Sequence, residues 1–183
     1  MDNVMISIDA SNLFKGERKH NWKIDYQKLI TYYKNKYLIT QSIYYDGFPT
    51  YSLEKRRIQN LTDKEFKIKE RKVNAKFTLI NSFGWKIIKK PVTFVKDFAT
   101  SSIKPKCNFD VEIAIDALDH IDNYDIFILG SGDGDFTPLI EYLKSKGKTV
   151  IVLSWRDRLS SILRESTPNI VTIGQLRSDI ELL

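Results

Sequence analysis

Short apolar runs alternate with longer amphipathic stretches along the chain, and this pattern predicts its secondary structure. The apolar runs predict strands at residues 4–8, 39–45, 85–90, 124–129 and 149–154, with a shorter one at 169–173. Helices are predicted at residues 25–37, 53–79, 110–121, 137–146 and 158–165, with a terminal helix from Gln175. Because strands and helices alternate throughout, we expect a three-layer α/β/α sandwich with a mostly parallel central sheet.

Turn residues and helix signals refine these boundaries. A turn is expected at residues 9–12, a loop at 46–49 (Asp-Gly-Phe-Pro), and a mobile loop at 98–108. The long helix could break near residues 61–63. Helix 137–146 has signals at both ends, which are Thr137 as N-cap, Pro138 at the first helical position and Gly147 after the end. In helix 110–121, four apolar side chains at helical spacing are expected to face the core: Val111, Ala114, Ile115 and Leu118.

The length and hydrophobic content of the chain suit one folded domain over residues 1–183. No apolar run approaches the roughly 20 residues of a membrane span. The N-terminal Met-Asp-Asn-Val lacks the basic start of a signal peptide. Cys107 is the single cysteine, so no internal disulfide can form. We therefore expect a cytoplasmic protein with no membrane partner.

Charge is distributed unevenly along the chain. Residues 51–90 contain twelve Lys/Arg and four Asp/Glu, whereas residues 107–141 contain nine Asp/Glu and no Lys/Arg. The first segment could attract a polyanion, and the second could hold cations.

Four acidic residues map to one edge of the predicted sheet. Asp9 directly follows the first strand, and Asp133 and Asp135 follow the fourth within a Gly-rich turn. Asp110 begins the helix that leads into the fourth strand, so it belongs to the same edge, where ligands of α/β proteins bind. Each acid also has a simpler reading, as an Asx-turn, a turn residue or a complement to a helix dipole. Their coincidence at one edge favours a functional site.

This acidic cluster suggests a hard metal ion. Four carboxylates in one small site would raise each other's pKa, and a divalent cation would remove that repulsion. Ligands that are all oxygen favour Mg²⁺ or Mn²⁺, and the lack of Cys/His spacing argues against zinc. Because Mg²⁺ takes only one or two carboxylates directly, the other acids could hold a second ion or orient water.

At these residues the chain resembles the NYN domain family, a branch of the PIN-like ribonucleases. The matching segments are residues 8–14 (IDASNLF), 106–118, 129–138 (LGSGDGDFTP) and 147–150, of which the SGDGDF block is the most specific. The chain departs from the family pattern Lys-Gly-x-Asp, because Cys107 and Asn108 follow Lys106. The resemblance implies a PIN-like fold and metal-dependent hydrolysis of RNA phosphodiester bonds. It also implies the catalytic and metal-binding residues Asp9, Asp110, Asp133 and Asp135, supported through hydrogen bonds by Asn12 and Ser131.

A ribonuclease must also hold a phosphate backbone, and the basic segment offers candidates. The RNA-binding residues that we predict are Lys55, Arg56, Arg57, Lys104 and Lys106. Further cations on the long helix are Lys64, Lys67, Lys69, Arg71, Lys72 and Lys76. Aromatic residues that could stack on unpaired bases are Tyr51, Phe66, Phe77 and Trp85. A charged helix can also be a solvated face, and such aromatics can belong to the core.

Two other functions stay open from the sequence. The first is a non-catalytic RNA-binding or regulatory module that keeps a relic acidic site. The second is a phosphatase of the haloacid dehalogenase type, because Gly132-Asp133-Gly134 is similar to one of its motifs. That family has Asp-x-Asp after its first strand, whereas this chain has Asp9-Ala10-Ser11. A dinucleotide-binding protein fits less well, since no Gly-x-Gly-x-x-Gly follows the first strand.

Overall fold

The computed structural model describes residues 1–52, 60–97 and 102–183. A six-stranded sheet forms its centre, and every neighbouring pair of strands in it is parallel. Across the sheet the strands are β3 (Lys86–Pro91), β2 (Leu38–Phe48), β1 (Asn3–Asp9), β6 (Ile126–Gly130), β7 (Thr149–Ser154) and β8 (Ile170–Thr172).

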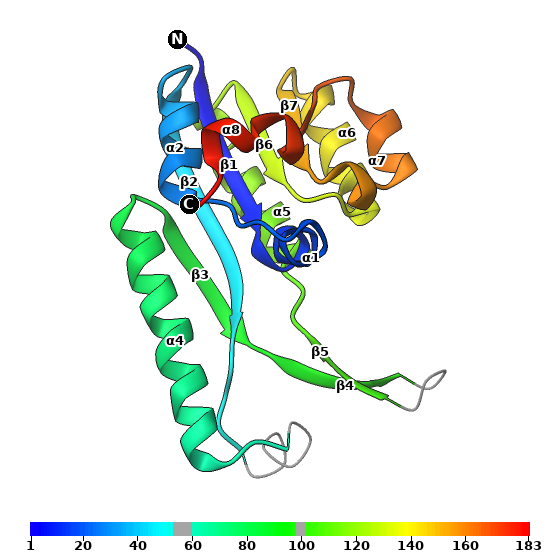
Figure 1. Ribbon diagram of the computed structural model, residues 1–183. Coiled ribbons are helices and arrows are strands. Elements are labelled where there is room, and N and C mark those ends of the chain that lie inside the picture. Colours follow the sequence, from blue (N-terminus) through cyan, green and yellow to red (C-terminus); the bar gives the residue numbers. More distant parts are fainter. Residues whose placement is uncertain (53–59, 98–101) are drawn as a thin grey trace.

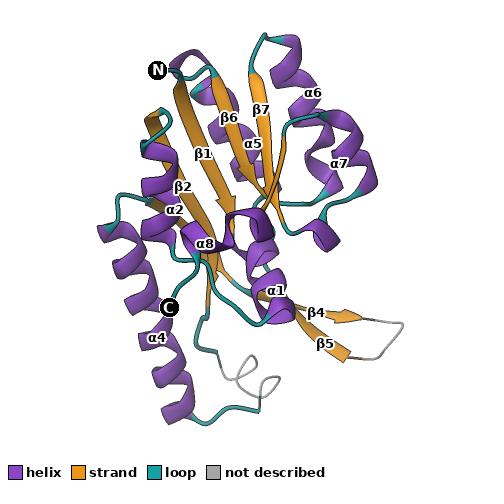
Figure 2. Ribbon diagram, turned by 45° about the horizontal axis from the view of Figure 1, so that its top comes forward, coloured by secondary structure: helices purple, strands orange, loops and turns teal. Residues whose placement is uncertain are grey.

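Helices cover both faces of this sheet (Figures 1 and 2). One face packs against α1 (Ala10–His20), α2 (Tyr26–Lys34), α4 (Asp63–Ser82) and α8 (Arg177–Ile180). The other packs against α5 (Asp110–Asp119), α6 (Thr137–Ser145) and α7 (Ser161–Ser166). Short 3₁₀ helices are η1 (Ile121–Asn123), η2 (Gly134–Phe136), η3 (Arg156–Arg158) and η4 (Ile173–Leu176). The predicted three-layer α/β sandwich is therefore confirmed.

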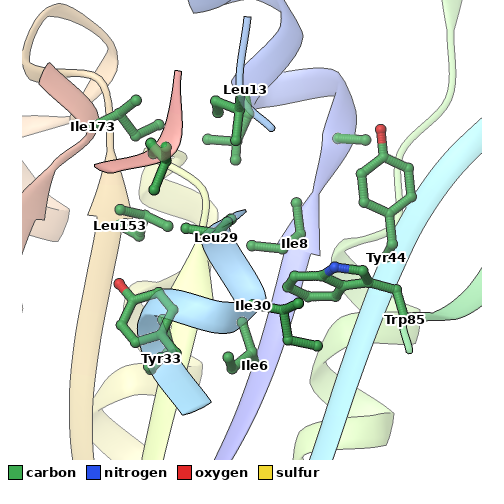
Figure 3. Close-up of a cluster of buried hydrophobic side chains, with 14 of the residues drawn as sticks. Ile6, Ile8, Leu13, Leu29, Ile30, Tyr33, Tyr44, Trp85, Leu153 and Ile173 are labelled. Carbon is green, nitrogen blue, oxygen red and sulfur yellow. The ribbon is translucent and has the colours of Figure 1, made fainter. Parts of the chain in front are cut away.

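Strand β1 lies in the middle of the sheet and is buried on both faces. Ile6 and Ile8 point into the cluster formed with α2, where Figure 3 shows them near Leu29, and Met5 points into the opposite cluster. The Trp85 indole closes the first cluster, and its N–H donates a hydrogen bond to the Tyr26 carbonyl at 3.0 Å. Burial on both faces explains why this strand is a continuous apolar run rather than an alternating one.

Two predicted turns are wrong because regular structure continues through them. Strand β2 extends over the predicted loop at 46–49, since its residues pair with β3 as far as Phe48 opposite Pro91. Gly47 permits this packing, because a Cβ there would lie 2.7 Å from a Val92 methyl group. The predicted turn at 9–12 is instead the start of α1, with Asp9 as its N-cap.

Helix α6 begins differently from the prediction. The turn η2 runs directly into it, so Phe136 is at the cap position and Thr137 is already helical. Thr137 as N-cap is therefore wrong. Gly147 follows the helix as expected, and its φ of 76° is one that glycine adopts without strain.

The basic part of the chain projects beyond the sheet. The predicted helix at 53–79 begins in the structure at Asp63, where Thr62 and Glu65 form a capping box, and residues 53–59 lie outside the described part. Of the predicted mobile loop at 98–108, residues 98–101 lie outside the described part. Residues 102–106 are instead strand β5 (Ser102–Lys106), which forms an antiparallel hairpin with β4 (Thr93–Asp97). Figures 1 and 2 show α4 and this hairpin extending past the carboxyl ends of β2 and β3.

Helix α5 presents a different face to the core from the one predicted. Ile113 and Ala117 are fully buried, together with Phe109 just before the helix. Of the four residues predicted to face inward, Ala114 is partly buried against the core. Val111, Ile115 and Leu118 are instead 67%, 52% and 40% exposed. The helix carries apolar residues on two faces, and periodicity alone did not show which of them meets the sheet.

Candidate active site

The chain reverses its winding direction between β1 and β6. From β1 it continues outward to β2 and β3 on one side, and from β6 it continues to β7 and β8 on the other. The two strands pair with Ile8 opposite Gly130, so Asp9 and Ser131 come one residue later at the same edge. In open α/β sheets a crevice forms at such a switch point, beyond the carboxyl ends of the strands.

Asp9 is held tightly at this edge, with 7% of its surface exposed. Its Oδ1 accepts hydrogen bonds from the Ser11 hydroxyl at 2.9 Å and the Asn12 backbone N–H at 3.2 Å. Its Oδ2 accepts one from the Ser131 hydroxyl at 3.3 Å. Burial raises the pKa of this carboxyl, although these hydrogen bonds and the charge of Lys15 act in the opposite direction.

A second set of hydrogen bonds joins the loop after β6 to α1. The Asn12 side-chain oxygen accepts a hydrogen bond from the Gly132 N–H at 3.2 Å, and the Ser131 hydroxyl accepts one from the Asp133 N–H at 3.3 Å. A Cβ on Gly132 would lie 2.2 Å from the Arg158 carbonyl oxygen, so only glycine fits. The structure thus brings the predicted supporting residues into contact with Asp9 and with the loop that carries Asp133.

Asp133 and Asp135 lie together in the turn that leads into α6. Asp133 precedes η2, and its Oδ1 accepts a hydrogen bond from the Asp135 N–H at 3.1 Å. Both residues are exposed, in contrast to Asp9.

Asp110 approaches the same place from α5, where it is the first residue. Burial raises the pKa of its carboxyl most, and the negative charges of Asp133, Asp9 and Asp135 raise it further. These electrostatic effects indicate that Asp110 lies within range of the charges of the other three predicted acids, although the four come from three separate segments of the chain.

Asn108 is a contributor to this region that the sequence prediction missed. Its side-chain amide donates to the Asp110 carboxylate at 2.6 Å, and its oxygen accepts from the Asp110 N–H at 2.7 Å. This bond to the carboxylate lowers the pKa of Asp110, against the larger effect of burial. An Asn two residues before the first helical Asp is a capping pattern, and that signal could have identified it.

The donors around this crevice fit a hard cation better than a soft one, since they are carboxylate, hydroxyl and amide oxygens. Repulsion among the acids at Asp110 also indicates that a positive charge would be favourable there. Within the described ranges, however, no three His, Cys, Asp or Glu side chains are grouped closely enough to hold a metal. Among hard cations, Mg²⁺ usually takes only one or two carboxylates directly and keeps several waters.

The structure gives less information on the predicted RNA-binding residues than on the acids. Lys55, Arg56 and Arg57 lie outside the described residues. Lys104 is a β5 residue, and Lys106 is exposed at the end of that strand.

On α4 all six predicted cations are exposed. One of them, Lys76, forms an ion pair with Asp46 of β2. The stacking prediction is wrong for Phe66, Phe77 and Trp85, which are buried in the fold, whereas Tyr51 is 51% exposed.

Comparison with known proteins agrees with this geometry. The family model described as NYN domain matches residues 3–174, which is nearly the whole chain. The chain belongs to the NYN domain family. At the family level NYN domains are PIN-like nucleases of the ribonuclease type that bind RNA. Among the helices of the described residues, none has the length and apolar character needed to cross a membrane.

Two relatives extend this result. The low amplitude and bright protein LabA of Synechococcus elongatus is 26% identical to this NYN chain over 179 residues, covering 96% of the chain and 86% of LabA. The crystal structure of VPA0982 from Vibrio parahaemolyticus, a protein of unknown function, has a TM-score of 0.70. It is 21% identical and covers 99% of this chain and 96% of its own, so it supports the fold alone.

Proposed function

We propose that this NYN protein is a metal-dependent ribonuclease that hydrolyses RNA phosphodiester bonds. The observation that carries the proposal is the edge of the sheet at the β1–β6 switch point, where Asp9 follows β1 and the loop that carries Asp133 and Asp135 follows β6. The charges of these three acids also act on Asp110 at the start of α5. A bound Mg²⁺ or Mn²⁺ supplies charge neutralisation at the phosphate and a lowered pKa for water. RNA is the substrate class that the family and the basic segment both support.

The acids have different parts in this proposal. Asp9 would be a rigid ligand, because three hydrogen bonds fix its carboxylate and 7% of the residue remains exposed. Asp110 and Asp133 would be the other residues that hold the cation. Asp135 would orient water or hold a second ion. Asn12 and Ser131 position Asp9 and the β6 loop through the hydrogen bonds described above.

The projecting basic elements hold the RNA backbone. Helix α4, whose cations are exposed, and the β4–β5 hairpin, which contains Lys106 and the predicted Lys104, extend past the same edge of the sheet as the acids. Phosphate contacts of this kind give affinity without sequence information.

We place the whole chain in a single NYN domain. We also infer a reducing, cytoplasmic setting, because Cys107 is a free, partly buried cysteine.

The direct test is cleavage of end-labelled RNA, both single-stranded and hairpin, by purified protein with Mn²⁺. We expect products with a 5′-phosphate and a 3′-hydroxyl, and at least about 100-fold slower cleavage by Asp133→Asn. Asp119→Asn is a matched control, because Asp119 is an exposed acid at the far end of α5. Intact RNA under all metal conditions, or an Asp133→Asn variant as active as the parent, would contradict the proposal.

A non-catalytic RNA-binding module is the second candidate. The observation in its favour is that the described residues contain no preformed group of three metal ligands. Equal RNA affinity in Mn²⁺ and in EDTA, with the RNA intact afterwards, would support it. The phosphatase is not proposed, because the position of its second acid is Ser11, whose hydroxyl donates to Asp9.

A further inference from the structure

A pocket of about 290 Å³ opens beside the acidic crevice, between α5 and the start of α6. Its lining residues are Asp110, Ala114 and Leu118 from α5, and Asp135, Phe136, Pro138, Leu139 and Tyr142 from η2 and α6. Two of the four site acids thus belong to the pocket wall. Asp110 and Leu118 are eight residues apart, so the pocket follows about 12 Å of the helix away from the crevice.

Beyond the two acids, the pocket wall is almost entirely apolar. Leu118 is 40% exposed and Tyr142 is 46% exposed, whereas Phe136 and Leu139 form the floor at 1% and 8%. An apolar hollow next to a charged site is typical of a ligand pocket rather than of ordinary surface. Its volume is at the lower end of the range for small-molecule pockets, which suits one flat ring system better than a larger ligand.

The charges near the pocket argue against a second copy of the chain as the occupant. Residues 107–141, which contain most of the pocket lining, include nine Asp/Glu and no Lys/Arg. A symmetric dimer through this face would bring Asp110 and Asp135 toward their own equivalents, and like charges repel. A nucleobase is neutral and flat, so it can fill the apolar part without meeting that repulsion.

Tyr142 provides the surface on which a base would stack. Its ring is exposed at the pocket wall, and the Lys146 ammonium lies 5.3 Å from the ring centroid. Stacking on an aromatic ring is open to every base, and a neighbouring cation favours the adjoining phosphate.

We propose that the α5–α6 pocket receives one unpaired base of the RNA strand, next to the nucleotide whose phosphate is cleaved. The proposal rests on the proposed ribonuclease function and makes it specific: the enzyme requires single-stranded RNA at the cut. A base paired in a duplex cannot enter the pocket without leaving its stack.

The experiment uses a 20-nucleotide single-stranded RNA with one abasic position that is moved along the strand. In wild-type protein with Mn²⁺, we expect each abasic position to reduce cleavage about 10-fold at one bond. The number of nucleotides between the abasic position and that bond should be the same for every RNA. Tyr142→Ala should lower cleavage at all bonds and abolish this position-specific loss, whereas Tyr142→Phe should retain it. Ile115→Ser is the control, because Ile115 is 52% exposed on α5 but does not line the pocket.

A second readout separates failure of the pocket from failure of the ribonuclease. RNA containing 4-thiouridine is irradiated with the Asp133→Asn variant, and mass spectrometry locates the crosslinked residue, which we expect to be Tyr142. Cleavage by wild-type protein without the position-specific loss, or a crosslink confined to α4, overturns the pocket proposal but not the proposed nuclease. A crosslink at Tyr142, combined with no cleavage by wild-type protein, supports base binding in the pocket and overturns the proposed nuclease. Loss of both activity and self-association in Ile115→Ser shows that a second copy covers this face, which also overturns the pocket.

Discussion

The acidic crevice and the projecting basic elements are built in opposite ways. At the crevice, Asp9 is buried and fixed by three hydrogen bonds from two different segments. On α4 most of the cations are exposed side chains, and the helix extends beyond the sheet. Fixed groups can act at one atom of a substrate, whereas flexible surface charges act over distance and are screened by salt. In the proposed function, chemistry therefore belongs to the first region and capture of RNA to the second.

The largest effect is expected from Asp9→Asn. The amide keeps the size of the side chain but removes the charge that a cation needs, so Mn²⁺-dependent cleavage should fall by about 100-fold or more. Single-turnover cleavage of saturating RNA measures this step. Asp125→Asn is the matched control, because Asp125 lies at the amino edge of the same strand pair and accepts a hydrogen bond from the Asn3 N–H. An unchanged rate in Asp9→Asn would remove the distinction between the two regions.

A smaller effect is expected when α4 loses charge. The double variant Lys67→Ala, Lys72→Ala should bind RNA several-fold more weakly at low salt, and the slope of log affinity against log salt should fall by about 1 to 2. Fluorescence anisotropy over a salt series gives both numbers. Cleavage at saturating RNA should stay within about two-fold of the parent, and Lys34→Ala at the end of α2 should change neither quantity. A large loss of the saturated rate would place α4 in the chemistry instead.

The smallest effect concerns stability without metal. Burial raises the pKa of Asp9 in the folded protein above its ordinary value of 3.8. At pH values between 3.8 and the pKa in the folded protein, the folded state therefore binds more protons than the unfolded state. Ionisation of this carboxyl therefore destabilises the fold as pH rises. In EDTA at pH 7, Asp9→Asn should melt a few degrees higher than the parent, and the difference should shrink as pH falls toward 4. Thermal melts of both proteins over this pH range test the prediction. A lower melting temperature for Asp9→Asn than for the parent at pH 7 would contradict it.

The sequence was sufficient for the features that depend on single strands. Apolar runs located β1, β6 and β7 because these strands are buried on both faces. An acid directly after such a run must lie at the carboxyl edge, so Asp9 and Asp133 could be placed without coordinates. Asp110 followed from the same reasoning, since a helix that returns along a parallel sheet begins at that edge.

The features that the sequence did not give depend on contacts between segments. Helix α5 has apolar residues on two faces, and only the packing of Ile113 and Ala117 against the sheet decides which face is inside. Phe66, Phe77 and Trp85 could be stacking residues or core residues until the packing around them is known. Asp-Gly at 46–47 is a strong turn signal, but pairing with β3 outweighs it. In each case the local pattern allows two outcomes, and a partner distant in sequence selects one.

The hydrogen bond between Ser131 and Asp9 joins residues 122 positions apart. Strand β1 is synthesised well before its neighbour β6, which leaves the ribosome only after the intervening residues have been made. At roughly 5–20 residues per second, this interval lasts on the order of 6 to 24 seconds. During that time one edge of β1 has no partner strand and the acidic crevice cannot form. Under the proposed function, a nascent chain would therefore be unable to cleave RNA near the ribosome that produces it, and activity would begin only when the second half of the sheet is in place.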